Sequence, residues 1–243
     1  MSLTPRIIFQ DNELLVLDKP AGMTVNKAES AKELTVQEWV ENSYKLQVTS
    51  YELENEMVRN FVARAGIVHR LDKDTSGVLL VAKTLEAMVA LQAQFKQRQI
   101  QKTYLALVHG WVSPEEGQIS AAISRNPFER RKFGVFLGGR ESTTDYRVVK
   151  TFDNPRLGQY SLVEAYPKTG RTHQIRVHFK FINHPVVADE LYAGRKTSRN
   201  DKKWCPRHFL HAYKIELTHP VSQRQVDFVA PLPLELEEAL AKL

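Results

Sequence analysis

The hydrophobic positions of this chain fall into short runs that predict many strands. Two apolar runs, at residues 7–9 and 14–17, are separated by Asp11 and Asn12, which predicts a β-hairpin closed by a turn. The continuous apolar run 78–82 predicts a buried strand. Alternating segments predict further strands at residues 103–108, 143–151, 160–165, 213–217 and 226–229.

Helical spacing of apolar residues appears in three other segments. Residues 35–46 place apolar side chains near helical spacing, and Thr84 is a suitable N-cap for a helix that follows it. Thr172 is a suitable N-cap for a third helix, which residues 183–185 (Asn-His-Pro) would end. The apolar positions of the second and third helices are Met88, Leu91, Phe95, Ile175, Phe179 and Ile182.

The chain contains no internal repeat, low-complexity tract or Gly/Ser linker that would divide it. We therefore expect residues 1–243 to form a single α+β domain. Residues 42–61 are polar and acidic with poor periodicity, and they predict a surface insertion within that domain.

Composition excludes several classes of protein. Hydrophobic residues make up 42% and charged residues 26% of the 243 positions, which is ordinary for a globular protein. No apolar run approaches the roughly 20 residues of a membrane span, so we expect no membrane association. The first residues lack the features of a signal or transit peptide, which favours a cytoplasmic protein. One cysteine, Cys205, allows neither an internal disulfide nor a cysteine-based metal site.

The net charge of +6 is unevenly distributed. Residues 29–56 carry seven Glu against two Lys, whereas residues 125–132 and 195–207 are strongly basic. Phe128 lies in the first basic cluster, Phe133 directly follows it and Trp204 lies in the second, and cations mixed with aromatic rings suit RNA phosphates and unstacked bases. Solvated loops would show the same charge runs, so this pattern alone does not establish a nucleic-acid partner.

One polar loop stands between two strand-like segments, and it contains His69, Arg70, Asp72 and Asp74. Such a loop at a sheet edge is a common location for a functional site. Asp74, Thr75 and Ser76 are also good turn formers, so residue types alone do not separate a site from a structural turn.

The loop closely resembles the catalytic loop of the RluA-type pseudouridine synthases, whose His-Arg-Leu-Asp and Thr-Ser-Gly stand here at residues 69–72 and 75–77. Four other blocks are similar to that family in the same order. They are Asp-Lys-Pro-Ala-Gly at 18–22, Lys-Thr-Tyr-Leu-Ala-Leu-Val-His-Gly at 102–110, the Thr-Gly-Arg-Thr-His-Gln-Ile-Arg-Val-His stretch at 169–178, and the C-terminal pattern at 210–212, 219–220 and 230–233.

The resemblance implies an RNA pseudouridine synthase, an isomerase that breaks the N1–C1′ bond of a uridine and rejoins the uracil through C5. It implies a mixed, mainly antiparallel sheet with a central catalytic cleft, and a reaction without a cofactor. Asp72 takes the catalytic carboxylate position, acting either as a nucleophile or as a base that removes a sugar proton. The sequence does not separate these two routes.

The same resemblance assigns the partners of Asp72. Arg176 is expected to pair with the Asp72 carboxylate, because an adjacent cation favours the ionised form. Tyr104 is expected to pack on the target base. Taken alone, Arg176 would be a surface ion pair and Tyr104 a packing residue.

The target uridine must leave its base stack, and we expect Arg70 to fill the vacated space with His69 in support. RNA contacts are expected from the block that begins at residue 169 and from the basic clusters: Arg171, His173, Arg130, Arg131, Lys132, Lys202 and Lys203. The basic clusters should face the RNA and the acidic segment should face away. The substrate is expected to be structured RNA, either 23S-type ribosomal RNA or transfer RNA, and the protein a monomer.

The eight histidines do not predict a metal site, because no His-Glu-x-x-His or cysteine pair accompanies them. No phosphate-loop or dinucleotide motif supports a nucleotide cofactor. Many relatives begin with an S4-type RNA-binding domain, but here the Asp-Lys-Pro-x-Gly turn starts at residue 18, so RNA docking is expected from the catalytic domain.

Two other functions fit parts of the sequence. A catalytically silent RNA-binding protein could retain the fold, but all the expected catalytic residue types are present. A hydrolase using Asp72 and Asp74 is disfavoured, because the two loop carboxylates have no fixed relative direction and lack a metal-binding set.

Overall fold

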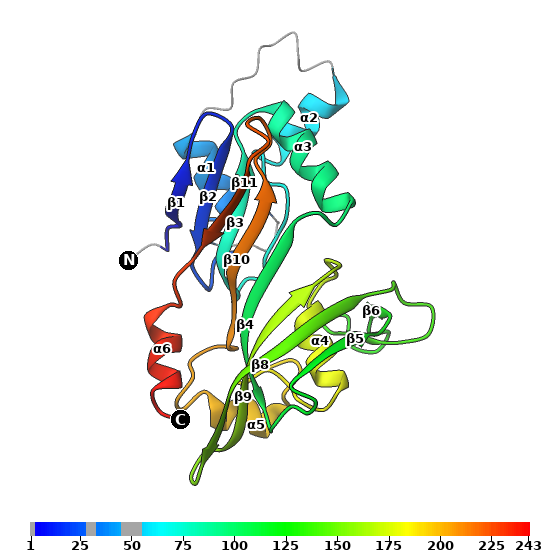
Figure 1. Ribbon diagram of the computed structural model, residues 1–243, viewed down its shortest axis with the longest axis vertical. Helices are drawn as coiled ribbons and strands as arrows, with labels where there is room; N and C mark the ends of the chain where they lie inside the picture. Colours follow the sequence, from blue (N-terminus) through cyan, green and yellow to red (C-terminus); the bar gives the residue numbers. More distant parts are fainter. Residues whose placement is uncertain (1–2, 28–32, 45–54) are drawn as a thin grey trace. The chain divides into compact units, whose positions relative to one another are not determined.

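The computed structural model describes residues 3–27, 33–44 and 55–243. Figure 1 shows the order of the helices and strands along these residues. The strands are β1 (Arg6–Gln10), β2 (Leu14–Lys19), β3 (Ser76–Ala82), β4 (Gln101–His109), β5 (Glu116–Ser120), β6 (Ile123–Arg125), β7 (Phe133–Val135), β8 (Thr143–Asn154), β9 (Gly158–Pro167), β10 (Leu210–Thr218) and β11 (Gln225–Val229). The helices are α1 (Val36–Ser43), α2 (Glu56–Ala63), α3 (Leu85–Lys96), α4 (Gln174–Phe181), α5 (Arg195–Asp201) and α6 (Leu234–Leu240).

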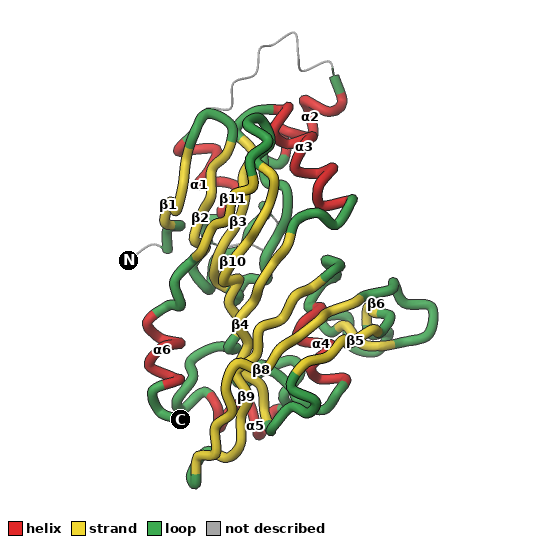
Figure 2. Tube along the Cα trace, viewed as in Figure 1, coloured by secondary structure: helices red, strands yellow, loops and turns green. Residues whose placement is uncertain are grey.

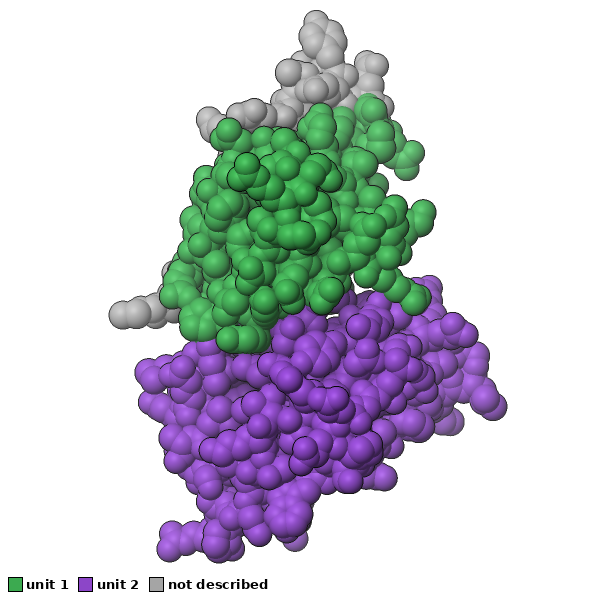
Figure 3. Space-filling model, in the orientation of Figure 1, with its two compact units in different colours: residues 1–101, 212–231 green, residues 102–211, 232–243 purple. Residues whose placement is uncertain are grey.

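The chain divides into two compact units, each made of two separate segments (Figure 3). Unit 1 is Met1–Gln101 with Ala212–Pro231, and unit 2 is Lys102–His211 with Leu232–Leu243. The chain passes between the units near the start of β4, within β10 and before α6. The single domain and its central cleft stay predictions.

Unit 1 is built on strands in the order β1-β2-β3-β10, with β11 next to β10 (Figure 2). The pairs β1–β2, β2–β3 and β10–β11 are antiparallel. Helix α3 packs against β3 and buries Met88 and Leu91 among the strand residues Leu14, Val16 and Leu80. This apolar face is the main core of unit 1.

Unit 2 is built on strands in the order β4-β9-β8-β5, all joined by antiparallel pairing. Helix α4 packs on β8 and β9, and its Ile175 and Phe179 are buried with Ala106 and Val163. Strands β6 and β7 form a separate two-stranded hairpin. The fold class predicted from the sequence, α+β with mainly antiparallel strands, is confirmed.

Local sequence signals located most of the strands but not β5, β6 or β7. The predicted strands are confirmed, and Thr84 caps α3 by accepting a 3.2 Å hydrogen bond from the Ala87 amide. Thr35 caps α1 in a reciprocal box with Glu38, but the expected helix end at residue 46 is wrong, because α1 ends at Ser43 and Tyr44 is already extended. The expected cap at Thr172 is wrong: the N-cap of α4 is His173, without a side-chain cap bond.

The segment 42–61 is described only in part, because residues 45–54 lie outside the described residues. Glu56–Ala63 forms helix α2, capped by Asn55, which accepts a 2.8 Å hydrogen bond from the Met57 amide. Val58 and Phe61 of this helix are buried, and Phe61 joins the core of unit 1.

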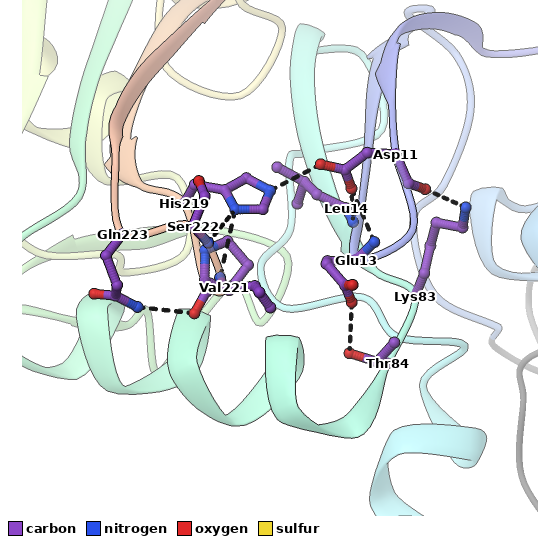
Figure 4. Close-up of polar contacts among 10 residues, drawn as sticks. Asp11, Glu13, Leu14, Lys83, Thr84, His219, Val221, Ser222 and Gln223 are labelled. Atoms are coloured by element: carbon purple, nitrogen blue, oxygen red, sulfur yellow. Dashed lines mark hydrogen bonds and ion pairs between the residues drawn. The ribbon is translucent and has the colours of Figure 1, made fainter.

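A polar clasp joins two turns of unit 1 (Figure 4). His219 Nε2 lies 2.9 Å from the Asp11 carboxylate, while His219 Nδ1 accepts a 3.1 Å hydrogen bond from the Ser222 amide. Burial pushes the pKa of Asp11 upward, but hydrogen bonds from the Leu14 and Glu13 amides and from His219 outweigh it and lower the pKa overall. The clasp therefore ties the β1–β2 turn to the turn before β11.

Candidate active site

The loop containing Asp72 is anchored at its start by His69. The Leu80 amide of β3 donates a 2.9 Å hydrogen bond to His69 Nε2, and the His69 ring lies 5.1 Å from that of Phe95. The His69 imidazole therefore attaches the start of the loop to β3 within unit 1, and its support of Arg70 in base flipping stays a prediction.

Lys19 anchors the other side of the same loop. Its ammonium is completely buried and donates to the carbonyl oxygens of Pro20, Met23 and Lys73 at 2.8–2.9 Å. The Gly22 amide donates a second 2.9 Å hydrogen bond to the Lys73 carbonyl. The block at residues 18–22 thus contacts the Asp72 loop at Lys73, one residue beyond Asp72. The sequence did not predict this anchoring role of Lys19, because the role depends on a tertiary contact.

Between these anchors the loop alternates buried and accessible side chains. Leu71 and Thr75 are buried, and the Thr75 amide closes a turn on the Asp72 carbonyl at 3.1 Å. Asp72 is half-buried, whereas Arg70 and Asp74 are exposed. This geometry fixes the backbone on both sides of Asp72 and leaves Arg70 accessible to a large ligand.

Tyr104 lies in unit 2 on β4, opposite Ala165 of β9. Its side chain is half-buried and packs against the core cluster that includes Ala106 and Ile175. This packing holds the Tyr104 ring at the core of unit 2, and its contact with the target base stays a prediction.

Arg176 is buried on α4 and is held by Asp189, a partner that sequence reasoning missed. Its Nε and Nη2 donate to the two Asp189 carboxylate oxygens at 2.6 and 2.8 Å. The guanidinium carbon also lies 5.1 Å from the centroid of the Tyr192 ring. Bidentate pairing gives the guanidinium a defined plane. The pairing of Arg176 with Asp72 stays a prediction.

Gln174 organises the turn that leads into α4. Its Oε1 accepts hydrogen bonds from the Thr169 hydroxyl at 2.6 Å and the Arg171 amide at 3.0 Å. Its Nε2 donates to the Thr143 carbonyl and the Thr144 hydroxyl. This side chain replaces the expected Thr172 cap, and it presents Arg171, whose Nε reaches the Glu141 carbonyl at 3.4 Å.

The two motif histidines of α4 have different surroundings. His173 has a φ of 56°, and its Nδ1 lies 2.8 Å from the Tyr192 hydroxyl. His178 is buried against Thr144 and the Ala121 carbonyl, and burial lowers its pKa. Among the described residues, no group of three His, Cys, Asp or Glu side chains could hold a metal ion.

Lys102 is the first residue of the block 102–110, and the sequence predicts no role for it. It lies on β4 two positions before Tyr104, on the same face of the strand. Its ammonium donates a long 3.4 Å hydrogen bond to the Thr169 carbonyl. Burial lowers the pKa of Lys102 to about 8.

The first basic cluster, residues 125–132, lies at the hairpin of β6 and β7. Phe128 is 95% exposed, and Arg130 and Arg131 are exposed as well. Lys132 is less available to bind an RNA phosphate, because its ammonium lies 2.8 Å from the Glu129 carboxylate.

The second basic cluster, residues 195–207, includes α5, and two of its members are not available to RNA. Trp204 is buried against Tyr160, so the suggested stacking of Trp204 on a base is wrong. Arg207 pairs with Glu235 of α6 at 3.1 Å. Lys202 and Lys203 are exposed, although Lys202 pairs with Glu190 and Lys203 donates to Asn200.

The acidic segment does not wholly face away from the Asp72 loop. The Glu33 carboxylate lies 3.6 Å from the ammonium of Lys73, which follows Asp72 in the loop. That expectation is therefore wrong at Glu33, because the loop's own cation attracts it.

The structure thus gathers the predicted residues into two sets. His69, Arg70 and Asp72 share one loop of unit 1, whereas Tyr104, Arg171, His173 and Arg176 lie in unit 2. Members of these sets are held or adjoined by residues whose role the sequence did not predict: Lys19, Lys102, Gln174, Asp189 and Tyr192.

The family model described as RNA pseudouridylate synthase matches residues 13–181, which contain the Asp72 loop, β4 and α4. The chain belongs to the RNA pseudouridylate synthase family.

Curated members of the RNA pseudouridylate synthase family match nearly the whole chain. "Ribosomal large subunit pseudouridine synthase D" of Nitrosomonas europaea is 38% identical over 97% of this chain and 64% of its own length. The protein of the same name from Pseudomonas aeruginosa is 38% identical over 93% of this chain and 68% of its own length. The chain therefore spans just under two thirds of the first relative.

The fold is also that of a solved member of the RNA pseudouridylate synthase family. The structure titled "Human RNA Pseudouridylate Synthase Domain Containing 1" superposes with a TM-score of 0.71 at 28% identity, covering 98% of this chain and 88% of that one.

Proposed function

We propose that this protein is an RNA pseudouridine synthase that isomerises a specific uridine of large-subunit ribosomal RNA. The observation that carries the proposal is the Asp72 loop, which is fixed on both sides by His69 and Lys19 within a chain of this family. Two curated relatives named for the ribosomal large subunit support this RNA over transfer RNA as the substrate.

The reaction breaks the N1–C1′ bond, turns the uracil and forms a C1′–C5 bond. N1 ends with a proton and C5 loses one, so the reaction needs no oxidant, reductant or cofactor. Asp72 initiates it as a nucleophile on the sugar or as a base that removes a sugar proton. In both routes the carboxylate must be ionised, and the guanidinium of Arg176 is the cation assigned to hold it.

The uridine reaches Asp72 only after extrusion from its stack, which costs a few kcal/mol. Arg70 is the exposed cation of the loop, and its planar guanidinium can occupy the vacated space and contact neighbouring bases. Tyr104 packs against the extruded base. Phosphate contacts come from Arg171, His173, Arg130, Arg131, Lys132, Lys202 and Lys203.

The proposed setting is a monomer acting on RNA in the cytoplasm. Within the part of the chain that the structure describes, no helix has the length and apolar character needed to cross a bilayer.

Tritium release tests the function directly, because C5 loses its hydrogen when it joins C1′. Large-subunit ribosomal RNA transcribed with [5-³H]uridine should release tritium with the wild-type protein, and Asp72→Asn should abolish release. RNA affinity should change little in Asp72→Asn, since phosphate contacts elsewhere supply most of the binding energy.

Asp74→Asn is the matched control, because Asp74 is an exposed carboxylate of the same loop. It should retain release. Tight, salt-dependent RNA binding by a wild-type protein that converts no uridine in ribosomal or transfer RNA would support the silent RNA-binding protein instead.

A further inference from the structure

Tyr192 is a buried side chain of unit 2 that contacts three parts of the site at once. Its ring lies beside the Arg176 guanidinium, with 5.1 Å between ring centroid and guanidinium carbon. Its hydroxyl oxygen is 2.8 Å from His173 Nδ1 and accepts a 2.9 Å hydrogen bond from the Phe133 amide. One residue therefore connects α4, the N-cap of α4 and the β6–β7 hairpin.

The hairpin side of this connection is closely packed. The Phe133 ring meets the His173 ring edge-on at 5.6 Å, and the Arg125 guanidinium lies 5.0 Å from the Phe133 centroid. Tyr192 forms a small core with Ile123 and Val177. Because close-packed interiors transmit displacement, a shift of the hairpin changes the position of the Tyr192 ring.

The Arg176 side depends on Tyr192 in two ways. The ring contacts the guanidinium, and the Tyr192 amide donates a 3.2 Å hydrogen bond to Asp189 Oδ1. The same Asp189 carboxylate accepts both donors from Arg176. The plane of the guanidinium is therefore set jointly by the ring and the backbone of residue 192.

The outer end of the hairpin presents the groups suited to RNA. Arg130 and Arg131 are exposed cations, and Phe128 is an almost fully exposed aromatic ring. Exposed aromatics beside cations stack on unpaired bases and bind the phosphates between them.

We propose that Tyr192 is a positioning residue that couples RNA contact at the hairpin to the orientation of Arg176. The inference rests on the proposed function. RNA held by Arg130 and Arg131 fixes the hairpin, the hairpin holds Tyr192 through Phe133 and His173, and Tyr192 holds the guanidinium.

Tyr192→Phe tests the hydroxyl contacts while keeping the ring beside Arg176. At saturating [5-³H]uridine-labelled large-subunit ribosomal RNA, single-turnover tritium release should slow about 3- to 10-fold, because the hydroxyl contacts with His173 and with the Phe133 amide are both lost. The RNA dissociation constant should stay within about twofold of the wild type. A wild-type rate in Tyr192→Phe overturns the proposal.

Tyr160→Phe is the matched control. Tyr160 is another buried tyrosine of unit 2; its hydroxyl donates to the Leu157 carbonyl at 2.6 Å, and its ring packs against His109 and Trp204. Its single-turnover rate should match that of the wild type, and a loss equal to that of Tyr192→Phe overturns the proposal.

A double-mutant cycle tests the coupling itself. Combining Arg130→Ala with Arg131→Ala should weaken RNA binding and also slow the saturating rate. In the Tyr192→Phe background the same pair of substitutions should still weaken RNA binding. The factor by which the pair slows the saturating rate should be at least threefold smaller there than in the wild-type background. If the combined variant is slowed by the product of the factors found for Tyr192→Phe and for the Arg pair separately, the two sites are independent and the proposed coupling is overturned.

Phe133→Leu provides a second entry to the same connection, because it removes the edge contact with His173 and keeps the backbone donor to Tyr192. If Tyr192→Phe does not fold, as judged by thermal unfolding, Phe133→Leu must show the same slower saturating rate, and a wild-type rate overturns the proposal. If the wild-type protein converts no uridine, the proposed function is overturned. If the wild type is active but the Arg130/Arg131 pair and Tyr192→Phe affect the saturating rate independently, only the coupling is overturned.

Discussion

At the scale of single residues, side chains outside the predicted catalytic set hold that set in place. Lys19 shows this most clearly, because a fully buried ammonium is stable only when its hydrogen bonds replace water. Three carbonyl oxygens at 2.8–2.9 Å do so, and the one from Lys73 belongs to the Asp72 loop.

Lys19→Met should therefore reduce both stability and activity. Loss of charge-assisted hydrogen bonds to buried carbonyls should lower the free energy of unfolding by at least about 2 kcal/mol. Single-turnover tritium release should also slow, because the backbone beside Asp72 loses an anchor. Urea unfolding measures the first effect, and Lys27→Met, at an exposed lysine paired with Glu41, should leave the midpoint nearly unchanged. Equal midpoints for the two variants contradict this account.

Lys102 gives a pH-dependent prediction. Its folded pKa of about 8 lies below the ordinary 10.5, so the folded protein binds fewer protons than the unfolded chain between these values. Burying the charged Lys102 ammonium therefore lowers the free energy of unfolding by its full amount below pH 8, and this loss of stability disappears as the pH rises toward 10.5. Lys102→Met should thus be more stable than wild type by roughly 3 kcal/mol at pH 7, at about 1.4 kcal/mol per pKa unit.

The difference in unfolding free energy between wild type and Lys102→Met should shrink steadily from pH 8 to pH 10. Chemical denaturation at each pH provides the measurement. A difference that does not change with pH would show that the Lys102 ammonium is not desolvated.

At the scale of elements, Gly77 shows how β3 begins after the Asp72 loop. Its φ is +115°, and a Cβ built there would lie 2.2 Å from the Ala212 carbonyl oxygen of β10. Both the backbone conformation and the close approach therefore require glycine.

Gly77→Ala should destabilise unit 1 by about 2 kcal/mol or more, because strain at a positive φ adds to the collision with backbone. Thermal unfolding should show a clearly lower midpoint. Gly158→Ala is the matched control: its φ is also positive, but no atom lies within 4 Å of an added Cβ. An equal loss in both variants would mean that the contact with Ala212 contributes nothing.

Elements with local signals could be predicted from the sequence, and those set by tertiary contacts could not. Thr35 and Thr84 predict the starts of α1 and α3, because an N-cap hydrogen bond joins residues only three positions apart in the sequence. Helix α6 has no side-chain hydrogen bond at its N-cap, and its Glu235 pairs with Arg207, which lies 28 positions earlier in the sequence.

The site follows the same rule. Asp72, Tyr104 and Arg176 could be proposed from motifs, because each carries a recognisable residue pattern. Asp189 and Tyr192 could not be linked to Arg176, because 13 positions separate Arg176 from Asp189 and only the folded turn brings them together. Trp204 was misassigned because an aromatic residue between cations has the same sequence pattern whether it is buried or exposed.

At the scale of the whole molecule, the net charge of +6 matters through its placement. Some cations are engaged inside the fold, such as Lys19 and Arg207, and others are exposed, such as Lys203. Only the exposed group can release counterions from RNA.

Lys202→Gln with Lys203→Gln should weaken RNA binding and reduce the slope of log affinity against log salt by about 1 to 2, the amount for one or two phosphates. Filter binding across a salt series gives the slope. Lys214→Gln is the control: Lys214 is paired with carboxylates, as Lys202 is, but it lies on β10, outside both basic clusters. An unchanged slope in the double variant removes α5 and its following turn from the RNA surface.

The central claim is that Asp72 isomerises a uridine of large-subunit ribosomal RNA, and mapping of pseudouridines in cells tests it most directly. Carbodiimide modification and reverse-transcriptase stops would be compared in RNA from a strain lacking the gene, complemented with wild type, Asp74→Asn or Asp72→Asn. The account predicts that wild type and Asp74→Asn restore a missing pseudouridine in large-subunit ribosomal RNA and that Asp72→Asn does not. Restoration by Asp72→Asn, or no difference between any of the strains, would contradict it.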